Sequence, residues 1–502
     1  MSEEPMNETH ETGTAAEIHA LRCADCARAD SADPDARPVD RLPIPVDALA
    51  GFPDGIPQTK GYDRRQFLRN GVLGFASVYA AHALNWTSIF EAAVAEAADP
   101  ANQLVMLYLN GGLDGLNCVL AADTASYGAY RTARPTLYRE LNAPSVPGRV
   151  GSTPAAGTGG SLSFANLMVS GAGNNGDTKG LDTLWGDGSG GAGSDLAYWP
   201  GMHFLPANGS HFEATDYIFA GNLGRLGTGW LGRWLDLYGS STNPLQAISI
   251  GSSLSKQIRT AAAPVCSVPT AFGNFRFDVS GVGSNANVNS EVGRLAAIPA
   301  ATAGIARSRS VFDTTVAVSN QLGSTAPPGE NPDYPASSLS DRLKTAATLL
   351  AANLGVKIVT IDWGSFDTHG EQATAMDPQI TTLSRALAAF KNDLAARGIE
   401  QRVITVVFTE FGRRVGENGS VGTDHGAGGP CFVLGSSIRG GLAADHPSVT
   451  SLMNGNLGVT TDFRTVWQAV ISEWLGGDPA LVLPGAPFAG ISRPDGQTTL
   501  LK

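Results

Sequence analysis

The stretch VKIVTIDWGSFDTH, residues 356–369, decides the fold class. Its first six residues are rich in Val and Ile and predict a buried strand, after which acidic and His side chains follow. A helical pattern of apolar residues precedes this strand at 343–354, another follows at 383–394, and residues 403–408 predict the next strand. The order helix, strand, helix, strand implies right-handed crossovers between parallel strands. We therefore expect an α/β fold with a mostly parallel central sheet.

The rest of the chain extends this sheet and interrupts it with loops. An apolar run at 104–109 predicts a first strand, and residues 462–475 predict a final helix. A loop-rich insertion is expected at about 140–197, where sequence rich in Gly, Ser, Thr and Ala has little to pack and predicts a surface segment. A second is expected at about 240–335, where several short strand-like pieces, such as residues 246–250, lie amid Gly, Pro and Ser. Residues 99–502 are therefore expected to form one α/β domain with insertions.

Composition argues against some classes of protein. The 502 residues carry a net charge of −12 without a basic stripe, so no nucleic-acid partner is expected. Five cysteines do not make a disulfide framework in a chain this long. Cys23 and Cys26 form a CxxC with no second pair nearby, which argues against zinc there. The other three are expected as core or loop thiols, with one disulfide possible.

The N-terminal sequence has the features of an export signal. Residues 1–60 lack apolar periodicity and are predicted to be disordered. Residues 61–98 hold Arg64-Arg65, a modest apolar stretch and an Ala-rich run, the order of a twin-arginine signal; an ordinary helix with a basic flank is the alternative. Neither stretch is long enough for a stable membrane span. We expect the twin-arginine translocation machinery as a partner and an exported, periplasmic or extracellular protein.

Carboxylates and imidazoles follow the first two predicted strands. Asp114 comes just after the strand at 104–109, within a Gly-Gly-x-Asp-Gly turn, where binding of local backbone amides is the competing interpretation. Asp367 and His369 follow the second strand, and their spacing places both side chains on one side of an extended segment. A carboxylate beside an imidazole suits zinc, manganese or iron better than calcium. A structurally satisfied pair in the core is the alternative.

Two further clusters follow the strand at 403–408. Glu410 comes directly after it, and an ion pair with a nearby Arg that pins the loop is a serious alternative to metal binding. Asp424 and His425 lie between two glycines in a loop where no packing demand explains a His. Four such clusters at the ends of separate segments are harder to explain by packing than any one of them.

Ser210-His211-Phe212 adds a hydroxyl to these clusters. A turn precedes Ser210 and Glu213 follows three residues later, which is the pattern of a helix N-cap. The functional interpretation places the Ser210 hydroxyl near a metal, where it becomes a nucleophile at a helix N-terminus able to hold an anion. The two roles are compatible.

These motifs resemble a known family. The resemblance lies in the twin arginines and in the blocks Gly111–Asn117, Ser210–Phe212, Gly229–Arg233, Phe366–His369, Thr409–Arg413 and Gly422–Gly426. Over roughly residues 60–490 the chain resembles the bacterial family called domain of unknown function 1501. That family is placed beside the alkaline phosphatases, the sulfatases and the phosphoglycerate mutases that do not use bisphosphoglycerate. The resemblance implies an alkaline-phosphatase-like three-layer sandwich.

The resemblance also implies roles for individual residues. One or two divalent ions (zinc, manganese or calcium) are implied, with ligands among Asp114, Asp367, His369, Glu410, Asp424 and His425. Ser210 is the implied nucleophile. His211 and Arg413 stand beside these motifs and are further candidate catalytic residues. Phe411 stands where the superfamily commonly has a ligand, and a phenyl ring cannot coordinate a metal, so the chain departs from the two-metal pattern here.

Two functions follow as expectations. The first is an exported metal-dependent hydrolase of phosphate or sulfate esters, with an anionic ester as substrate. The second is a catalytically degenerate binding or assembly protein of the cell envelope. A serine hydrolase built on Ser210 and His425 is a weaker third, because no GxSxG turn surrounds Ser210.

Overall fold

The computed structural model describes residues 102–171, 179–189, 191, 193–271 and 333–502, with positions 294, 318, 322 and 331. The expectations of a disordered extension, a twin-arginine segment and an N-terminal CxxC, and much of the second insertion, lie outside these residues. Within the described ranges, no helix combines the length and the apolar character that crossing a membrane requires. Cys118, Cys266 and Cys431 are buried free thiols.

The fold is mixed α/β around a largely parallel central sheet, as the sequence predicts. The strand order is β11-β5-β10-β9-β1-β8-β6-β7, with β12 also paired to β5. Its strands are β1 Gln103–Leu109, β5 Leu196–His203, β6 Ala247–Ile250, β7 Cys266–Val268, β8 Ile358–Trp363, β9 Val403–Thr409, β10 Gly429–Leu434, β11 Gly441–Leu442 and β12 Thr461–Asp462. Among the strands that the structure describes, only β10 runs antiparallel to its two neighbours in this sheet.

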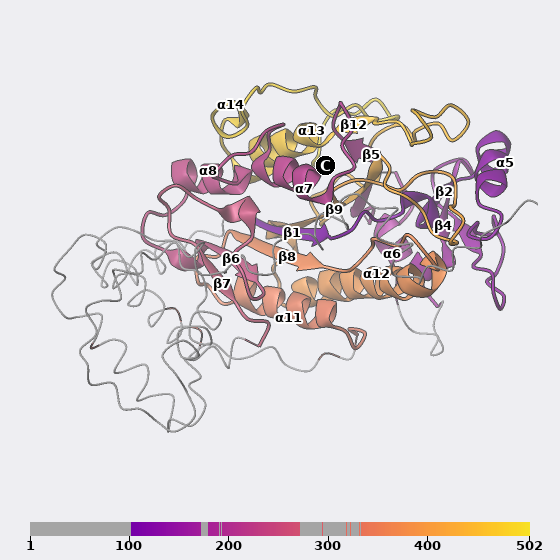
Figure 1. Cartoon of the computed structure of the whole chain (residues 1–502). Helices are drawn as coiled ribbons and strands as arrows, with labels where there is room; N and C mark the ends of the chain where they lie inside the picture. The colour runs from indigo at the N-terminus through magenta and orange to yellow at the C-terminus, as the bar shows by residue number, and fades with distance from the viewer. Residues whose placement is uncertain are drawn as a thin grey trace, which may run out of the picture. The chain divides into compact units, whose positions relative to one another are not determined.

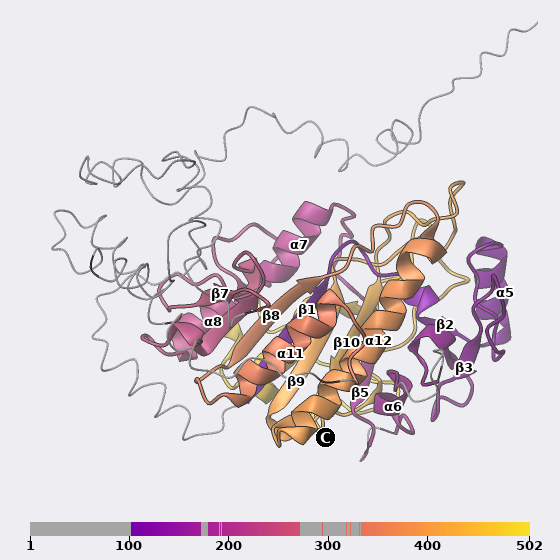
Figure 2. The same ribbon diagram turned by 90° about the horizontal axis from the view of Figure 1, so that it is seen from below.

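Helices cover both faces of this sheet (Figure 1). On one face lie α11 Ser338–Ala351 and α12 Gln372–Ala396, and Figure 2 shows both running along the strands. The other face carries α7 His211–Ala220, α8 Trp230–Tyr238 and α13 Phe463–Ala469, which continues as a π-helical turn, Val470–Leu475. Further helices are α5 Thr124–Ala133, α6 Asp182–Trp185, α14 Pro479–Val482 and the 3-10 turns Gly115–Asn117, Asn166–Met168, Pro244–Gln246, Lys256–Ile258 and Glu400–Arg402.

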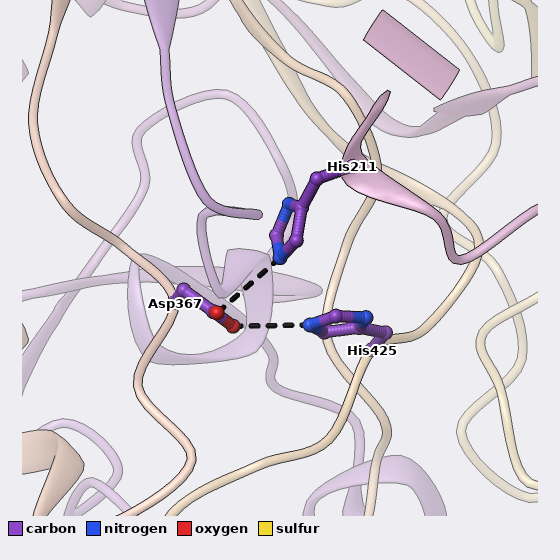
Figure 3. Close-up of side chains that lie close together, drawn as sticks. All are labelled: His211, Asp367 and His425. Atoms are coloured by element: carbon purple, nitrogen blue, oxygen red, sulfur yellow. Dashed lines mark hydrogen bonds and ion pairs between the residues drawn. The ribbon is translucent and has the colours of Figure 1, made fainter. Parts of the chain in front are cut away.

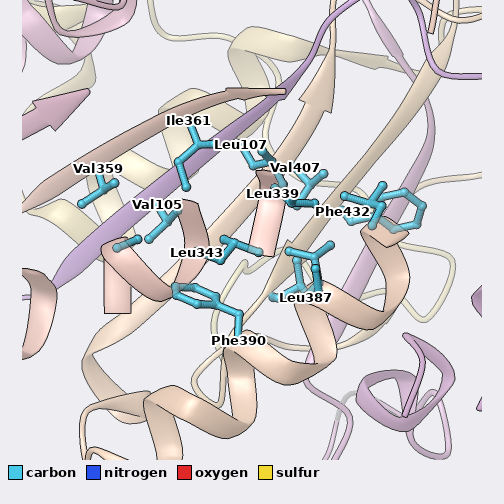
Figure 4. Close-up of a cluster of buried hydrophobic side chains, with 14 of the residues drawn as sticks. Val105, Leu107, Leu339, Leu343, Val359, Ile361, Leu387, Phe390, Val407 and Phe432 are labelled. Carbon is cyan, nitrogen blue, oxygen red and sulfur yellow. The ribbon is translucent and has the colours of Figure 1, made fainter. Parts of the chain in front are cut away.

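Strand β1 contributes side chains to two hydrophobic cores, one on each face of the sheet, because successive side chains point to opposite faces. Val105 and Leu107 point into the layer under α11 and α12, together with Leu343, Leu387 and Phe390 (Figure 4). The intervening side chains of β1 pack into the second core, under α7, α8 and α13. Every residue of β1 is buried, which explains why the strand reads as a continuous apolar run rather than an alternating one.

The first insertion packs more than its composition predicts. Strands β2 Val119–Ala121, β3 Ser152–Pro154 and β4 Leu162–Ala165 form a second, antiparallel sheet. Phe164 and Trp185 are buried and meet edge to face with ring centroids 5.3 Å apart. The expectation of a surface loop with little to pack is therefore wrong for these residues. A few large side chains among many glycines supply the core that the average composition conceals.

The strand register aligns the ends of three neighbouring strands. Leu109, the last residue of β1, pairs with Trp363 at the end of β8 and with Thr409 at the end of β9. The segments that follow these strands must therefore emerge together, at what we call the carboxyl edge of the sheet. Strand β5 also ends there, and antiparallel β10 begins there.

Candidate metal centre

One carboxylate at the carboxyl edge is surrounded by three imidazoles. Asp367 lies in the segment after β8, and its Oδ1 is 3.0 Å from Nε2 of both His369 and His425. Its Oδ2 is 3.3 Å from Nε2 of His211. Figure 3 shows His211 and His425 pointing at Asp367 from two sides. The four residues come from three separate segments, which only the folded sheet brings together.

Each of the three imidazoles is oriented through its other ring nitrogen. Nδ1 of His211 lies 2.6 Å from Glu410 Oε1, and Nδ1 of His369 lies 3.2 Å from Asp424 Oδ1. Nδ1 of His425 lies 2.8 Å from the backbone oxygen of Gly209. All three partners are oxygen acceptors, so each Nδ1 carries the proton and donates it. The lone pairs of neutral rings then reside on the Nε2 atoms that converge on Asp367.

This convergence fits a cation. Nε2 of His369 and Nε2 of His425 are 3.0 Å apart, and two lone pairs facing each other beside a carboxylate repel unless a proton or a metal ion lies among them. His211, Asp367 and His425 each offer a ligand atom within 4.8 Å of the others, the spacing of a possible metal site. Imidazoles held by carboxylates and carbonyl oxygens are the usual surroundings of bound metal ions.

The charges of the site are strongly coupled. Burial disfavours the charged form of His211, but hydrogen bonds to Asp367 and Glu410 outweigh it and raise the pKa of His211 to about 9. Burial also opposes ionisation of Asp367, yet the three imidazoles and Arg413 hold its pKa well below the usual range. Burial also opposes ionisation of Glu410, but the hydrogen bond and the charge of His211 outweigh it and lower the pKa of Glu410. Both carboxylates are therefore ionised at neutral pH.

Glu410 lies behind the imidazoles rather than among the metal-facing atoms. Its side chain is fully buried and accepts hydrogen bonds from the Gly111 amide at 2.8 Å and the Thr409 hydroxyl at 2.9 Å. Asp424 has the same relation to His369, with Asn418 as a further donor at 3.1 Å. Burial works against ionisation of Asp424, whereas Asn418 and His369 favour it and lower its pKa. Both acids, predicted as ligands, orient imidazoles instead.

Arg413 binds backbone rather than facing solvent. Its buried guanidinium donates to the carbonyl oxygens of Gly111, Gly112, Phe366 and Thr423. It also donates to Asp367 Oδ1 at 2.7 Å. The expected catalytic role needs correction, because these five acceptors engage the guanidinium from all sides. The alternative of a Glu410–Arg ion pair is wrong, because Arg413 pairs with Asp367 and Glu410 pairs with His211.

Two glycines permit the loops to approach this closely. Gly111 has φ +108°, and a Cβ there would lie 2.5 Å from the Asp367 amide nitrogen. Gly422 packs directly against the His369 backbone, so a side chain at that position would displace the ligand loop. The glycines in both sequence blocks therefore serve the site through their lack of a side chain.

Asp114 does not join the group around Asp367. It is buried, and its two oxygens accept from Arg134 at 2.5 and 3.1 Å. Gln372 donates to it at 2.5 Å. The sequence-based expectation of a metal ligand is corrected accordingly, because an internal guanidinium already neutralises this carboxylate. The turn interpretation also fails, since its partners are distant side chains and not local amides.

Ser210 is the N-cap of α7, as its pattern predicts. Its hydroxyl accepts from the Glu213 amide at a long 3.5 Å. Ser210 follows Gly209, which holds His425, and precedes His211, so its backbone is next to both imidazoles. Phe411 packs against the rings of His211 and His425, each at 4.8 Å between centroids, and supplies no ligand atom.

Several residues of the site could not be found from the sequence. The Gly209 carbonyl, Asn418 and Gln372 act through contacts with partners that lie far away along the chain. Arg134 lies in an unremarkable helical stretch, and nothing in its local pattern indicates a buried ion pair. No motif or spacing carried a signal for these four positions.

The fold and the site together define a mixed α/β protein with a candidate metal centre of His and Asp at the carboxyl edge of its sheet. Residues 285–450 match the family described as "Protein of unknown function (DUF1501)", and this match supports the DUF1501 family for the chain. The matched segment contains Asp367, His369 and His425. It begins after Ser210 and His211, which therefore lie outside it. No match to a curated protein was found.

Proposed function

We propose that the chain is a metal-dependent hydrolase of phosphate or sulfate esters with an alkaline-phosphatase-like site, exported by the twin-arginine route to the periplasm or beyond. The observation that carries this proposal is the convergence of three Nε2 atoms on Asp367 while all three Nδ1 atoms are held by oxygen acceptors. An array of this kind is costly to assemble without a cation to bind.

His211, Asp367 and His425 are the proposed ligands, with His369 beside them. Three imidazoles and one carboxylate suit zinc or manganese better than calcium, which prefers oxygen. A bound divalent ion would act as a Lewis acid that stabilises negative charge on an ester oxygen and lowers the pKa of a nearby hydroxyl. The ligand side chains are between 11% and 26% exposed, which leaves the group accessible from solvent.

Ser210 is the proposed nucleophile. Its hydroxyl makes only a long capping contact, so little is lost when it turns toward a substrate. The first turn of α7, a helix of ten residues, begins beside it, and the positive end of the helix dipole favours an anionic group at this position. Arg413 acts on the substrate only indirectly, by fixing Asp367 and the loop backbones.

The test combines metal analysis with kinetics on the full chain. Wild type should contain about one equivalent of metal and cleave p-nitrophenyl phosphate or p-nitrophenyl sulfate. Ser210→Ala should keep the metal and lose the turnover. Ser337→Ala is a matched control, because Ser337 is also a helix N-cap, on α11; loss of either cap costs about 1 kcal/mol of stability. Equal activity in both variants would refute the nucleophile.

A second candidate is a non-catalytic binding or assembly protein of the cell envelope. Phe411 occupies the floor of the site without offering a ligand, and Asp114 is neutralised by Arg134. Both features reduce the number of groups available for metal binding. Saturable cleavage of either ester that vanishes in Asp367→Ala would exclude this candidate.

A further inference from the structure

A buried polar network lies beneath the metal centre. It contains Asp114, Arg134 and Gln372, whose side chains are 1%, 0% and 0% exposed. These residues come from the turn after β1, the end of α5 and the first position of α12. A charged pair with a carboxamide is costly to bury, so full satisfaction of its hydrogen bonds matters.

The Gln372 carboxamide joins this network to the two ligand loops. Its Nε2 donates to Asp114 Oδ2, while its Oε1 accepts from the hydroxyls of Thr368, at 3.1 Å, and Thr423. An ionised carboxylate can only accept, so Asp114 fixes which end of the amide faces the hydroxyls. One side chain therefore holds both threonines in a defined orientation.

The two threonines are the immediate neighbours of the site residues. Thr368 lies between Asp367 and His369, and Thr423 directly precedes Asp424 and His425. The Thr423 amide also donates to the Thr368 carbonyl at 3.1 Å, so the two loops are joined at the same position. A displacement of either threonine must move a metal-facing side chain.

Arg134 fixes an earlier part of the loop that carries Thr423 and His425. It donates to the carbonyl oxygens of Arg414 at 2.8 Å and Val415 at 2.7 Å while it pairs with Asp114. The backbone of Arg413 to Val415 is thus tied to the same carboxylate as Gln372. Asp114, which the sequence singles out as a ligand, accepts from both Arg134 and Gln372, the two side chains that make these ties.

We propose that Gln372, oriented by the Asp114–Arg134 pair, is a positioning residue that sets the metal affinity of the centre without touching the ion. This inference rests on the proposed metal centre. Residues that orient ligands typically change metal affinity by about 10- to 100-fold when substituted. Gln372 acts one contact further away, through two threonines, and we expect about tenfold.

The experiment compares metal affinity and ligand geometry in the full chain. Gln372→Leu removes the carboxamide at similar size, and Thr423→Val removes one hydroxyl while keeping its shape. Thr423→Ser restores the hydroxyl. Thr345→Val is the matched control, since Thr345 is fully buried on α11 and its hydroxyl donates to the Thr270 carbonyl. Zinc affinity is measured by chelator competition, and geometry from the visible absorption bands of the cobalt-substituted protein.

Gln372→Leu and Thr423→Val should bind zinc about tenfold more weakly and shift the cobalt bands, whereas Thr423→Ser and Thr345→Val should resemble wild type. Wild-type affinity and cobalt spectrum in folded Thr423→Val would overturn the inference even if Gln372→Leu does not fold. Absence of metal binding in wild type would overturn both this inference and the proposed function. Unchanged affinity in the variants alone would overturn only the role of Gln372.

Discussion

Metal-free protein should lose stability as the pH rises through about 9, and His211 should be the cause. Its ring lies between two carboxylates, Glu410 at 2.6 Å and Asp367 at 3.3 Å. Burial disfavours the imidazolium, yet these contacts raise the pKa of His211 from its usual 6.5 to about 9. Because the folded state binds this proton more tightly, the stabilisation is complete below pH 6.5 and is lost as the pH passes 9.

The size of the effect follows from the two pKa values. Each tenfold shift of a protonation equilibrium corresponds to about 1.4 kcal/mol, so the interval from 6.5 to about 9 amounts to roughly 3 kcal/mol of unfolding free energy. The His211 side chain is only 18% exposed, so solvent screening removes a small part of this value. The contribution is shared with Asp367 and Glu410 and must not be counted again for them.

The assay is urea unfolding of chelator-treated protein, followed by Trp fluorescence at pH 6 and pH 9.5. Wild type should lose about 3 kcal/mol more than His211→Gln between the two pH values. Other groups that titrate in this range affect both proteins equally. His446→Gln is a matched control, because the Nδ1 of His446 lies 2.9 Å from the Pro447 carbonyl oxygen, a neutral partner. Equal losses in wild type and His211→Gln would refute the reasoning.

Four further outcomes follow from the contacts of the metal centre and of the hydrophobic core. Glu410→Gln should weaken metal binding about 10- to 100-fold by isothermal titration, since His211 loses its anionic partner. Metal affinity of wild type should fall as the pH is lowered below about 9, because protons and metal compete for His211, and a titration series at several pH values checks this. The double variant Asp367→Ala/His369→Ala should carry no metal by mass spectrometry. Phe390→Ala, in the core under α12, should cost about 3–5 kcal/mol in urea unfolding and leave metal affinity unchanged.

The central sheet could be predicted because its strands are buried on both faces. Continuous apolar runs marked β1, β8 and β9 to within two residues of their observed ends. Helix α12 was predicted only from its regular apolar face. It begins much earlier, at Gln372. Met376 and Ile380 are buried and continue the apolar face, but the interior Pro378 argues against a helix there. The start of the helix was therefore missed at a proline, although the apolar periodicity itself extends into these turns.

The residues of the site could also be predicted only in part. Asp367, His369 and His425 could be identified because titratable side chains stood in glycine-flanked loops after strands. The distinction between a ligand and its supporting acid could not be made. Glu410, Asp424 and Asp114 differ in the side chain that each one contacts. Two of these partners are far away along the chain, since Glu410 contacts His211 and Asp114 contacts Gln372.

The reversed direction of β10 has a consequence for how this site can change over evolutionary time. Because β9 ends and β10 begins at the same edge, one excursion of the chain, residues 410–428, leaves the sheet and returns to it there. That excursion carries Glu410, Arg413, Asp424 and His425. A lineage could remodel it without altering a single strand pairing, so divergence in ion or substrate preference among related chains should concentrate in this excursion while the sheet is inherited intact.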